Sequence, residues 1–278
     1  MTPSMRPSVR ALAAFDLLGQ SARPLAGGQG RAWSVGSLVL KPVDDVVEAA
    51  WSADVLSVLV EDGFRVSRPV RSSTEEWVVD GWSAWERLSG EHVTEGRWME
   101  VLDVGQKFNV ALSEVMRPGF LDSRTHAWAV ADRMAWGEQP VTVIHEVLRP
   151  LADRLSALLR PDDSQSQVIH GDLTHNVLFA PDLPPGVIDF TPYWRPARFC
   201  LAIVAVDAVL WHGAPKWLPD AVPGTDDRTS LLARAALRRL IASDRRAADG
   251  EAPTRDGYLR STAVDHERVL RLLEKRPA

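Results

Sequence analysis

Residues 168–179 read VIHGDLTHNVLF, and the interpretation of the whole chain starts from this stretch. A short apolar run enters a His-Gly-Asp turn that contains Asp172, and Asn176 precedes a second apolar run. Residues 186–190 read GVIDF, another strand-like run, which contains Asp189. Two apolar runs that bring Asp172, Asn176 and Asp189 to one end supply what magnesium-assisted phosphoryl transfer requires. One carboxylate takes or orients the acceptor hydroxyl, and an amide oxygen and a second carboxylate hold the metal.

A glycine-rich segment near the start of the chain is the candidate phosphate-binding loop. Gly28 and Gly30 lie between two runs that could be strands, and glycine lets a backbone approach phosphates and offer N–H groups to them. Taken alone, the segment fits a plain hairpin turn better. Lys41 ends the following strand-like run, where an ammonium group could bind phosphate. A strand-end lysine that faces solvent is an equal alternative.

Residues 44–61 predict an amphipathic helix that Asp44 or Asp45 can cap. Glu48 lies in its first turns. Its side chain either faces solvent or turns inward to pair with Lys41.

Residues 76–88 predict a β-hairpin, because Asp-Gly at positions 80–81 is a strong turn signal between β-rich runs. Residues 89–91 read SGE and break this pattern. We therefore predict two parts, a nucleotide-binding N-terminal lobe over residues 1–88 and a helical C-terminal lobe over residues 89–278.

Beyond the hairpin the chain is mainly helical. Apolar periodicity predicts helices, one of them broken or kinked at Pro150, over residues 98–116, 123–136, 141–159, 199–211, 229–243 and 261–273. Five arginines give the fifth of these helices and its end a basic face, which we interpret first as solvent-exposed and second as an anion or partner site: Arg234, Arg238, Arg239, Arg245 and Arg246.

Composition limits the class of protein. The 278 residues are 45% hydrophobic and 25% charged, as in ordinary globular proteins, and can bury a large core. A net charge of -5 argues against nucleic acid as the main partner. Cys200 is the single cysteine, which excludes an internal disulfide and fits a cytoplasmic protein. No signal peptide or membrane-spanning run is evident, so we expect no membrane partner.

In this order, the motifs resemble the aminoglycoside phosphotransferase family of the protein-kinase-like superfamily. The resemblance covers roughly residues 20–215 and is strongest at 170–173 and 187–190. It implies an α+β, protein-kinase-like bilobal fold with a small β-rich N-lobe and a larger, mainly helical C-lobe. It also implies ATP and Mg²⁺ as cofactors.

The resemblance implies roles for the residues of the central stretch. Asp172 is expected to be the catalytic carboxylate near the acceptor hydroxyl, and His170 to support its loop through hydrogen bonds. Asn176 and Asp189 are expected to bind magnesium. No role follows for His175, which we expect to be an exposed loop residue.

The resemblance also implies a nucleotide site in the N-terminal lobe. Lys41 is expected to contact the phosphates of ATP and to pair with Glu48, and Gly28 and Gly30 to lie over the phosphates. The adenine edge is expected to meet the backbone of a linker formed by Glu86, Arg87 and Leu88.

The chain departs from the family pattern at three places. The separation of Asp172 and Asn176 is one residue shorter than usual, and Thr191 stands where a glycine is frequent. An Asp-Leu-Ala helix start is replaced by Cys-Leu-Ala at residues 200–202. Asp207 is either a replacement for the missing aspartate or, as we prefer, only a capped or paired helix residue.

These observations favour a small-molecule kinase that moves the γ-phosphoryl group of ATP to a hydroxyl of an unidentified small molecule. The alternative is a catalytically inactive, nucleotide-binding regulator that acts through a protein partner. A protein-substrate kinase is a weaker option, because the segment after Asp189 is short and rich in proline and aromatic residues. Tyr193, Trp194 and Arg195 either line the acceptor pocket or form a rigid packed turn.

Overall fold

The structure is a computed structural model that describes residues 6–25, 30–92, 95–224, 227–250 and 255–275. The chain divides into two compact units, Met1–His92 with Asn176–Phe190, and Val93–His175 with Thr191–Ala278. The predicted boundary at residue 88 lies close to the end of the first segment. The first unit also contains residues 176–190, which the sequence analysis assigned to the helical lobe.

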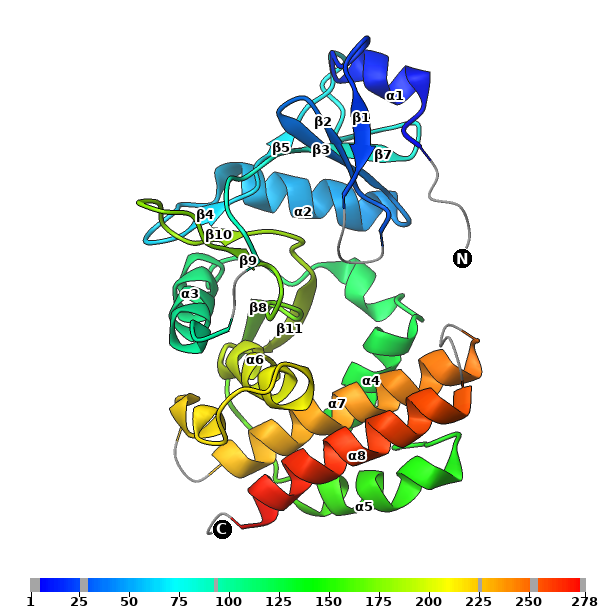
Figure 1. Cartoon of the computed structure of the whole chain (residues 1–278), viewed down its shortest axis with the longest axis vertical. Coiled ribbons are helices and arrows are strands. Elements are labelled where there is room, and N and C mark those ends of the chain that lie inside the picture. Colours follow the sequence, from blue (N-terminus) through cyan, green and yellow to red (C-terminus); the bar gives the residue numbers. More distant parts are fainter. Residues whose placement is uncertain (1–5, 26–29, 93–94, 225–226, 251–254, 276–278) are drawn as a thin grey trace. The chain divides into compact units, whose positions relative to one another are not determined.

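An antiparallel six-stranded sheet forms the framework of the first unit (Figure 1). Its order is β1-β2-β3-β7-β5, with β6 paired to β7. The strands are β1 (Ala22–Pro24), β2 (Trp33–Val35), β3 (Leu38–Pro42), β5 (Pro69–Val70), β6 (Val78–Val79) and β7 (Trp82–Glu86). The short helix α1 (Val9–Ala14) contributes Ala11 to the core that covers β3 and β7, where Leu40 and Trp82 are buried. The predicted hairpin is confirmed, and its turn residues have the positive φ angles that a tight β-turn requires.

Helix α2 (Val46–Val58) follows the sheet strand β3. The Asp45 side chain caps it by accepting hydrogen bonds from the N–H groups of Val47 and Glu48, at 2.8 and 3.0 Å. A second, three-stranded sheet joins distant segments of the chain. In it β10 (Gly186–Val187) pairs in parallel with β4 (Arg65–Val66) and antiparallel with β9 (Val177–Leu178).

The second unit is mainly helical. Figure 1 shows α7 and α8 running alongside each other, and α7 packs against α4, α5, α6 and α8. The helices are α3 (Trp98–Ala111), α4 (Ala127–Ala135), α5 (Arg149–Ala157), α6 (Arg198–Trp211), α7 (Arg228–Ala248) and α8 (Arg255–Glu274), with 3-10 turns η1 (Gly119–Asp122), η2 (Glu146–Leu148) and η3 (Leu218–Ala221). The predicted break at Pro150 is a helix start, because Pro150 lies at the beginning of α5.

A two-stranded ribbon completes the second unit. Strand β8 (Ser166–His170) pairs antiparallel with β11 (Pro192–Pro196). Helix α6 packs against both strands, and its residues from Phe199 to Leu210 are all buried. The ribbon therefore packs on an apolar helix. The last residue of β8, His170, is the first residue of the His-Gly-Asp turn.

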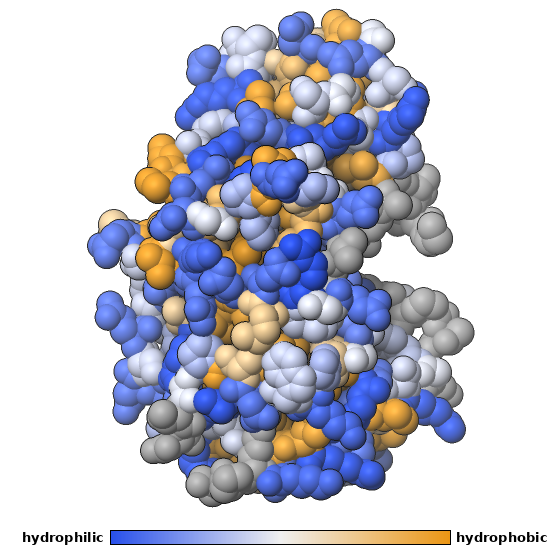
Figure 2. Space-filling model, turned by 60° about the vertical axis from the view of Figure 1, so that its left-hand side comes forward, coloured by the Kyte–Doolittle hydropathy of each residue, from blue (hydrophilic) through white to orange (hydrophobic). Residues whose placement is uncertain are grey.

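Hydrophilic residues cover most of the face shown in Figure 2, and apolar residues form small separate groups on it. Among the described residues, none of the helices is both long and apolar enough to cross a membrane.

Candidate active site

The His-Gly-Asp turn is held in place by backbone pairing and by close packing. Strand β8 delivers a fully buried His170, whose Nδ1 accepts a hydrogen bond of 3.1 Å from the Asp172 N–H. Gly171 donates its N–H to the carbonyl of Thr191 at 2.8 Å. A Cβ atom at Gly171 would lie 2.2 Å from the ring of Tyr193, so only glycine fits this approach. The turn thus presents the Asp172 carboxylate from a rigid base.

A buried arginine from α7 binds the Asp172 carboxylate. Arg239 Nη2 donates to Asp172 Oδ1 at 2.9 Å, and Arg239 Nε donates to Asp207 Oδ1 at 2.7 Å. The second oxygen of Asp207 accepts from Arg239 Nη2 and, at 2.8 Å, from the hydroxyl of Thr174. Arg239 and Asp207 are only 3% and 2% exposed in their side chains. One buried ion pair therefore connects α6, α7 and both sides of the loop that carries Asp172.

The charges of this cluster set the protonation of Asp172. Burial acts to raise the pKa of its carboxyl, but the guanidinium of Arg239, with smaller contributions from His170 and Arg238, lowers that pKa below its ordinary value. Burial raises the pKa of Asp207, against the opposing effect of Arg239. Asp172 is accordingly an anion at neutral pH.

The predicted solvent-exposed basic face is wrong for three of its five arginines. Arg234, Arg238 and Arg239 are buried, because each finds a polar partner inside the unit. Arg234 donates to the carbonyl of Ala135 at 2.7 Å, and Arg238 donates to the carbonyl of Gly171 at 3.2 Å. Asp207 is a paired helix residue, as we preferred, and in addition it accepts a hydrogen bond from Thr174 of the loop that carries Asp172. One sequence feature could have indicated that these arginines are buried: they lie among alanines and leucines on one helix.

In the first unit, Lys41 and Asp189 form an ion pair. Lys41 lies in β3, and its Nζ contacts Asp189 Oδ1 and lies 5.4 Å from the centroid of the Trp85 ring. Asp189 has a φ of 51°, a left-handed conformation that costs free energy for a residue other than glycine. With this backbone conformation, the Asp189 carboxylate contacts Lys41 of β3.

The antiparallel register of β9 and β10 brings Asn176 close to Asp189. Val177 pairs with Val187, and the Asn176 carbonyl accepts a 2.9 Å hydrogen bond from the Ile188 N–H. Asn176 therefore lies opposite the residue that precedes Asp189, even though its separation from Asp172 is one residue short.

The other predicted nucleotide contacts are placed only in part. Gly28 lies outside the described residues, while Gly30 has a φ of 65° that favours glycine. Glu48 occupies the first turn of α2. The predicted pairing of Lys41 with Glu48 stays a prediction.

Backbone hydrogen bonds hold the first two residues of the linker after β7 to their neighbours. Glu86 donates its N–H to the carbonyl of Arg68 at 2.7 Å, and its own carbonyl accepts from Ser67 Oγ at 2.7 Å. Arg87 donates its N–H to the Ser37 carbonyl at 2.9 Å. Within the part of the chain that the structure describes, the backbone of Leu88 makes no hydrogen bond. The predicted contact of the linker backbone with the adenine edge stays a prediction.

His175 is exposed, as expected, but it has partners. Its Nε2 lies 2.9 Å from His212 Nε2, and the ring of His212 stacks on Trp98 with centroids 5.8 Å apart. Burial, followed by the charge of His175, lowers the pKa of His212.

Comparison with known proteins identifies the family. The model of the phosphotransferase enzyme family matches residues 21–238, most of the chain. The chain belongs to this family. A comparison with curated proteins finds no significant match.

Solved structures of aminoglycoside phosphotransferases share the fold of this phosphotransferase. The enzyme from Alicyclobacillus acidocaldarius is 16% identical, with a TM-score of 0.60 over 98% of this chain and 96% of that one. The AMP-bound complex of spectinomycin phosphotransferase is 11% identical, with a TM-score of 0.62 over 96% of both chains. The GDP complex of an aminoglycoside 2'-phosphotransferase is 15% identical, with a TM-score of 0.57 over 94% of this chain and 96% of that one. The family resemblance and the α+β, kinase-like fold are confirmed.

Proposed function

We propose that this phosphotransferase moves the γ-phosphoryl group of ATP to a hydroxyl of a small molecule, with magnesium. The observation that carries the proposal is the ion pair of Lys41 with Asp189 in the first unit, together with the backbone of Asn176, whose carbonyl bonds the residue before Asp189. Structures with this fold hold ADP and spectinomycin in one case, and AMP-PNP and hygromycin B in another.

The residues of this group fit a magnesium ion. Asp189 and Asn176 have the oxygen atoms that magnesium prefers as ligands. The Asp189 carboxylate is already paired with one cation, the ammonium group of Lys41. Among the described residues, no group of three or more His, Cys, Asp or Glu side chains could hold a metal. A site of one carboxylate and one amide suits an ion that shares its remaining positions with water and phosphates. Bound there, magnesium neutralises charge on the phosphates.

The chain's own residues bind the nucleotide and position the acceptor. Lys41 binds the phosphates, the segment around Gly28 and Gly30 covers them, and the backbone of Leu88 binds the edge of the base. Asp172 accepts a hydrogen bond from the acceptor hydroxyl and takes its proton. His170 and Arg239 keep the Asp172 carboxylate in place.

A calorimetric titration of ATP, with and without magnesium, tests the nucleotide site. Asp189→Asn should weaken magnesium-dependent binding at least about tenfold, because it removes a charged ligand. Asp182→Asn is the matched control, since Asp182 is also an exposed aspartate with a positive φ, 57° against 51° for Asp189. Binding that ignores both magnesium and Asp189→Asn would contradict the proposal.

The alternative, an inactive nucleotide-binding regulator, is favoured by one observation. Arg239 engages the Asp172 carboxylate, which reduces its strength as a base. Turnover of ATP decides between the two. A catalyst loses its turnover in Asp172→Asn while keeping its affinity for ATP, whereas a regulator shows no turnover with any acceptor in either form.

A further inference from the structure

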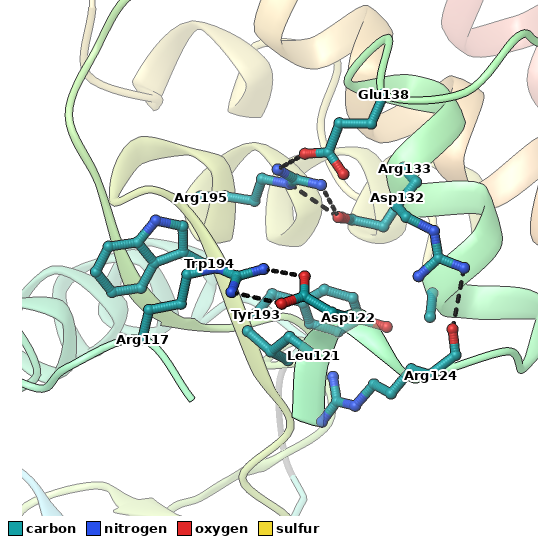
Figure 3. Close-up of a pocket in the computed structure, with 11 residues that line it drawn as sticks. Arg117, Leu121, Asp122, Arg124, Asp132, Arg133, Glu138, Tyr193, Trp194 and Arg195 are labelled. Atoms are coloured by element: carbon teal, nitrogen blue, oxygen red, sulfur yellow. Dashed lines mark hydrogen bonds and ion pairs between the residues drawn. The ribbon is translucent and has the colours of Figure 1, made fainter. Parts of the chain in front are cut away.

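A small pocket in the second unit lies against the loop that carries Asp172. It has a volume of about 90 Å³ and is lined by η1, α4 and β11 (Figure 3). Tyr193 of β11 lines it, and the ring of this tyrosine packs on Gly171, the residue before Asp172. A molecule in this pocket would therefore contact a residue that packs directly on the turn that carries the candidate catalytic carboxylate. Of the two interpretations left open for residues 193–195, the structure favours a pocket lining.

The carboxylates of this pocket are already neutralised. Asp122 receives two hydrogen bonds from Arg117, which hold its pKa below the ordinary value. Asp132 accepts from Arg195 Nε at 2.8 Å, and Glu138 accepts from the same guanidinium. Figure 3 shows both ion-paired groups facing the pocket. A cationic ligand would have to compete with an arginine for each of the three acids.

Arg133 differs from the ion-paired arginines of the pocket, Arg117 and Arg195. Four arginines and three carboxylates line the pocket, and Arg238 Nε also lies 3.3 Å from Asp132 Oδ1, so cations outnumber carboxylates here. Arg133 is half-buried, and Nη2 of its guanidinium donates to the carbonyl of Arg124 at 3.0 Å. Within the described residues it forms no ion pair with a carboxylate. Guanidinium has five N–H donors, and the bond to the Arg124 carbonyl engages one of those of Arg133.

The neighbourhood of the pocket is positive as well. Burial, with the charges of Arg124, Arg238 and Arg133, lowers the pKa of His126 to about 4. This histidine is therefore neutral at physiological pH and adds no further cation. Burial is the largest cause of this shift, and the three guanidinium groups add to it as positive charges that attract anions.

We propose that this pocket binds the acceptor of the phosphotransferase and selects a small hydroxylated molecule with an anionic group, a carboxylate or a phosphate, held by Arg133. The inference rests on the proposed function, to which it adds the charge class of the acceptor. Tyr193, Trp194 and Leu121 offer apolar surface for a short carbon skeleton. The pocket is not built for a polycation.

The transfer step conserves atoms and charge. The acceptor hydroxyl oxygen forms a bond to the γ-phosphorus of ATP, and the bond from that phosphorus to the bridging β–γ oxygen breaks. ADP departs with the electron pair of the broken bond. The hydroxyl proton passes to the carboxylate of Asp172 and from there to water.

The test uses four acceptors of one carbon skeleton and different charge: glycerate and glycerol phosphate as anions, glycerol as the neutral molecule and serinol as the cation. Binding to the full chain is measured by saturation-transfer NMR, and phosphorylation by ADP release with ATP and magnesium. We expect the anions to bind most tightly. If serinol binds as well as glycerate, or better, the proposed charge class is wrong.

Variants of Arg133 locate the effect. Arg133→Met should weaken the binding of both anions at least about tenfold and leave glycerol unchanged, while Arg133→Lys should retain part of the affinity, because a charge remains. Arg149→Met is the control, since Arg149 is an exposed arginine at the start of α5. Equal losses for glycerol and glycerate would show a structural effect and overturn the inference.

The outcomes separate this inference from the proposed function. Magnesium-dependent ATP binding without preference for anions refutes only the charge class. Loss of one anion but not the other distinguishes a carboxylate site from a phosphate site. Absence of ATP binding with intact, Arg133-dependent binding of anions refutes the kinase and keeps the pocket as an anion site.

Discussion

Replacing Arg239 by methionine should destabilise the second unit strongly. The substitution removes both hydrogen bonds to Asp207 and the one to Asp172, and it leaves Asp207 charged and buried. Breaking a buried ion pair from one side costs about 3–5 kcal/mol, because the remaining charge is uncompensated. The hydroxyl of Thr174 still donates to Asp207, but one such bond offsets only about 1 kcal/mol. The exposed contact with Asp172 adds little.

The loss should depend on pH in a defined direction. Burial acts to raise the pKa of Asp207, and without Arg239 that pKa rises further. The folded variant then binds a proton that the unfolded chain releases, so its free energy of unfolding increases as the pH falls from neutrality towards the unfolded pKa. The deficit relative to the wild type should therefore be largest near neutral pH and smaller in mild acid.

Urea denaturation at several pH values, followed by tryptophan fluorescence and circular dichroism, measures this effect. The double variant Arg239→Met with Asp207→Asn should recover most of the loss, because no buried charge remains. Arg234→Met is the control: Arg234 is also buried, but it donates to backbone carbonyls of Ala135 and Arg160, so its loss should show no such pH dependence. A stable Arg239→Met variant, or a double variant no more stable than the single one, would refute this account of the cluster.

Three further results are expected. Lys41→Met should weaken ATP binding at least about tenfold by calorimetry, through the lost charge on the phosphates, and an unchanged Kd would exclude that role. Gly171→Ala should cost about 1–3 kcal/mol in denaturation, because the new Cβ meets the ring of Tyr193, and Tyr193→Ala in the same chain should relieve the clash. Burial lowers the pKa of His266 from 6.5 to about 4. As the pH decreases from 6.5 to 4, the unfolded state binds the proton first. The free energy of unfolding should therefore decrease by about 3 kcal/mol over this range. His266→Gln should lose this part of the acid sensitivity, and an identical acid loss in both proteins would contradict the assignment.

Local patterns were enough to find the elements that carry the candidate nucleotide-binding residues. Asp80-Gly81 predicted a hairpin because its turn needs two positive φ angles, and those angles are present. Asp44 or Asp45 was predicted to cap the start of α2, and the structure selects Asp45, whose side chain caps two N–H groups. Apolar runs that end in polar residues placed Lys41 and Asp189 at strand ends. These features depend on residues that are close in the sequence, so they can be predicted from the sequence alone.

Long-range contacts decided the surroundings of the candidate catalytic carboxylate, Asp172. From the arginines of α7 we predicted a solvent-exposed face, because burying a guanidinium group without a polar or charged partner costs free energy. Those partners, Asp207 and Asp172, lie on other elements far along the chain, and only folding brings them to Arg239. The strand pairing that brings residues 176–190 into the first unit is equally remote, because β10 pairs in parallel with β4.

The sequence by itself therefore determined the family, the α+β fold and the order of the candidate site residues. Tertiary structure alone decided which charges are buried and what they bind. The physical reason is that helix, strand and turn propensities act over a few residues, whereas the cost of burying an ion is set by whichever opposite charge the fold places beside it.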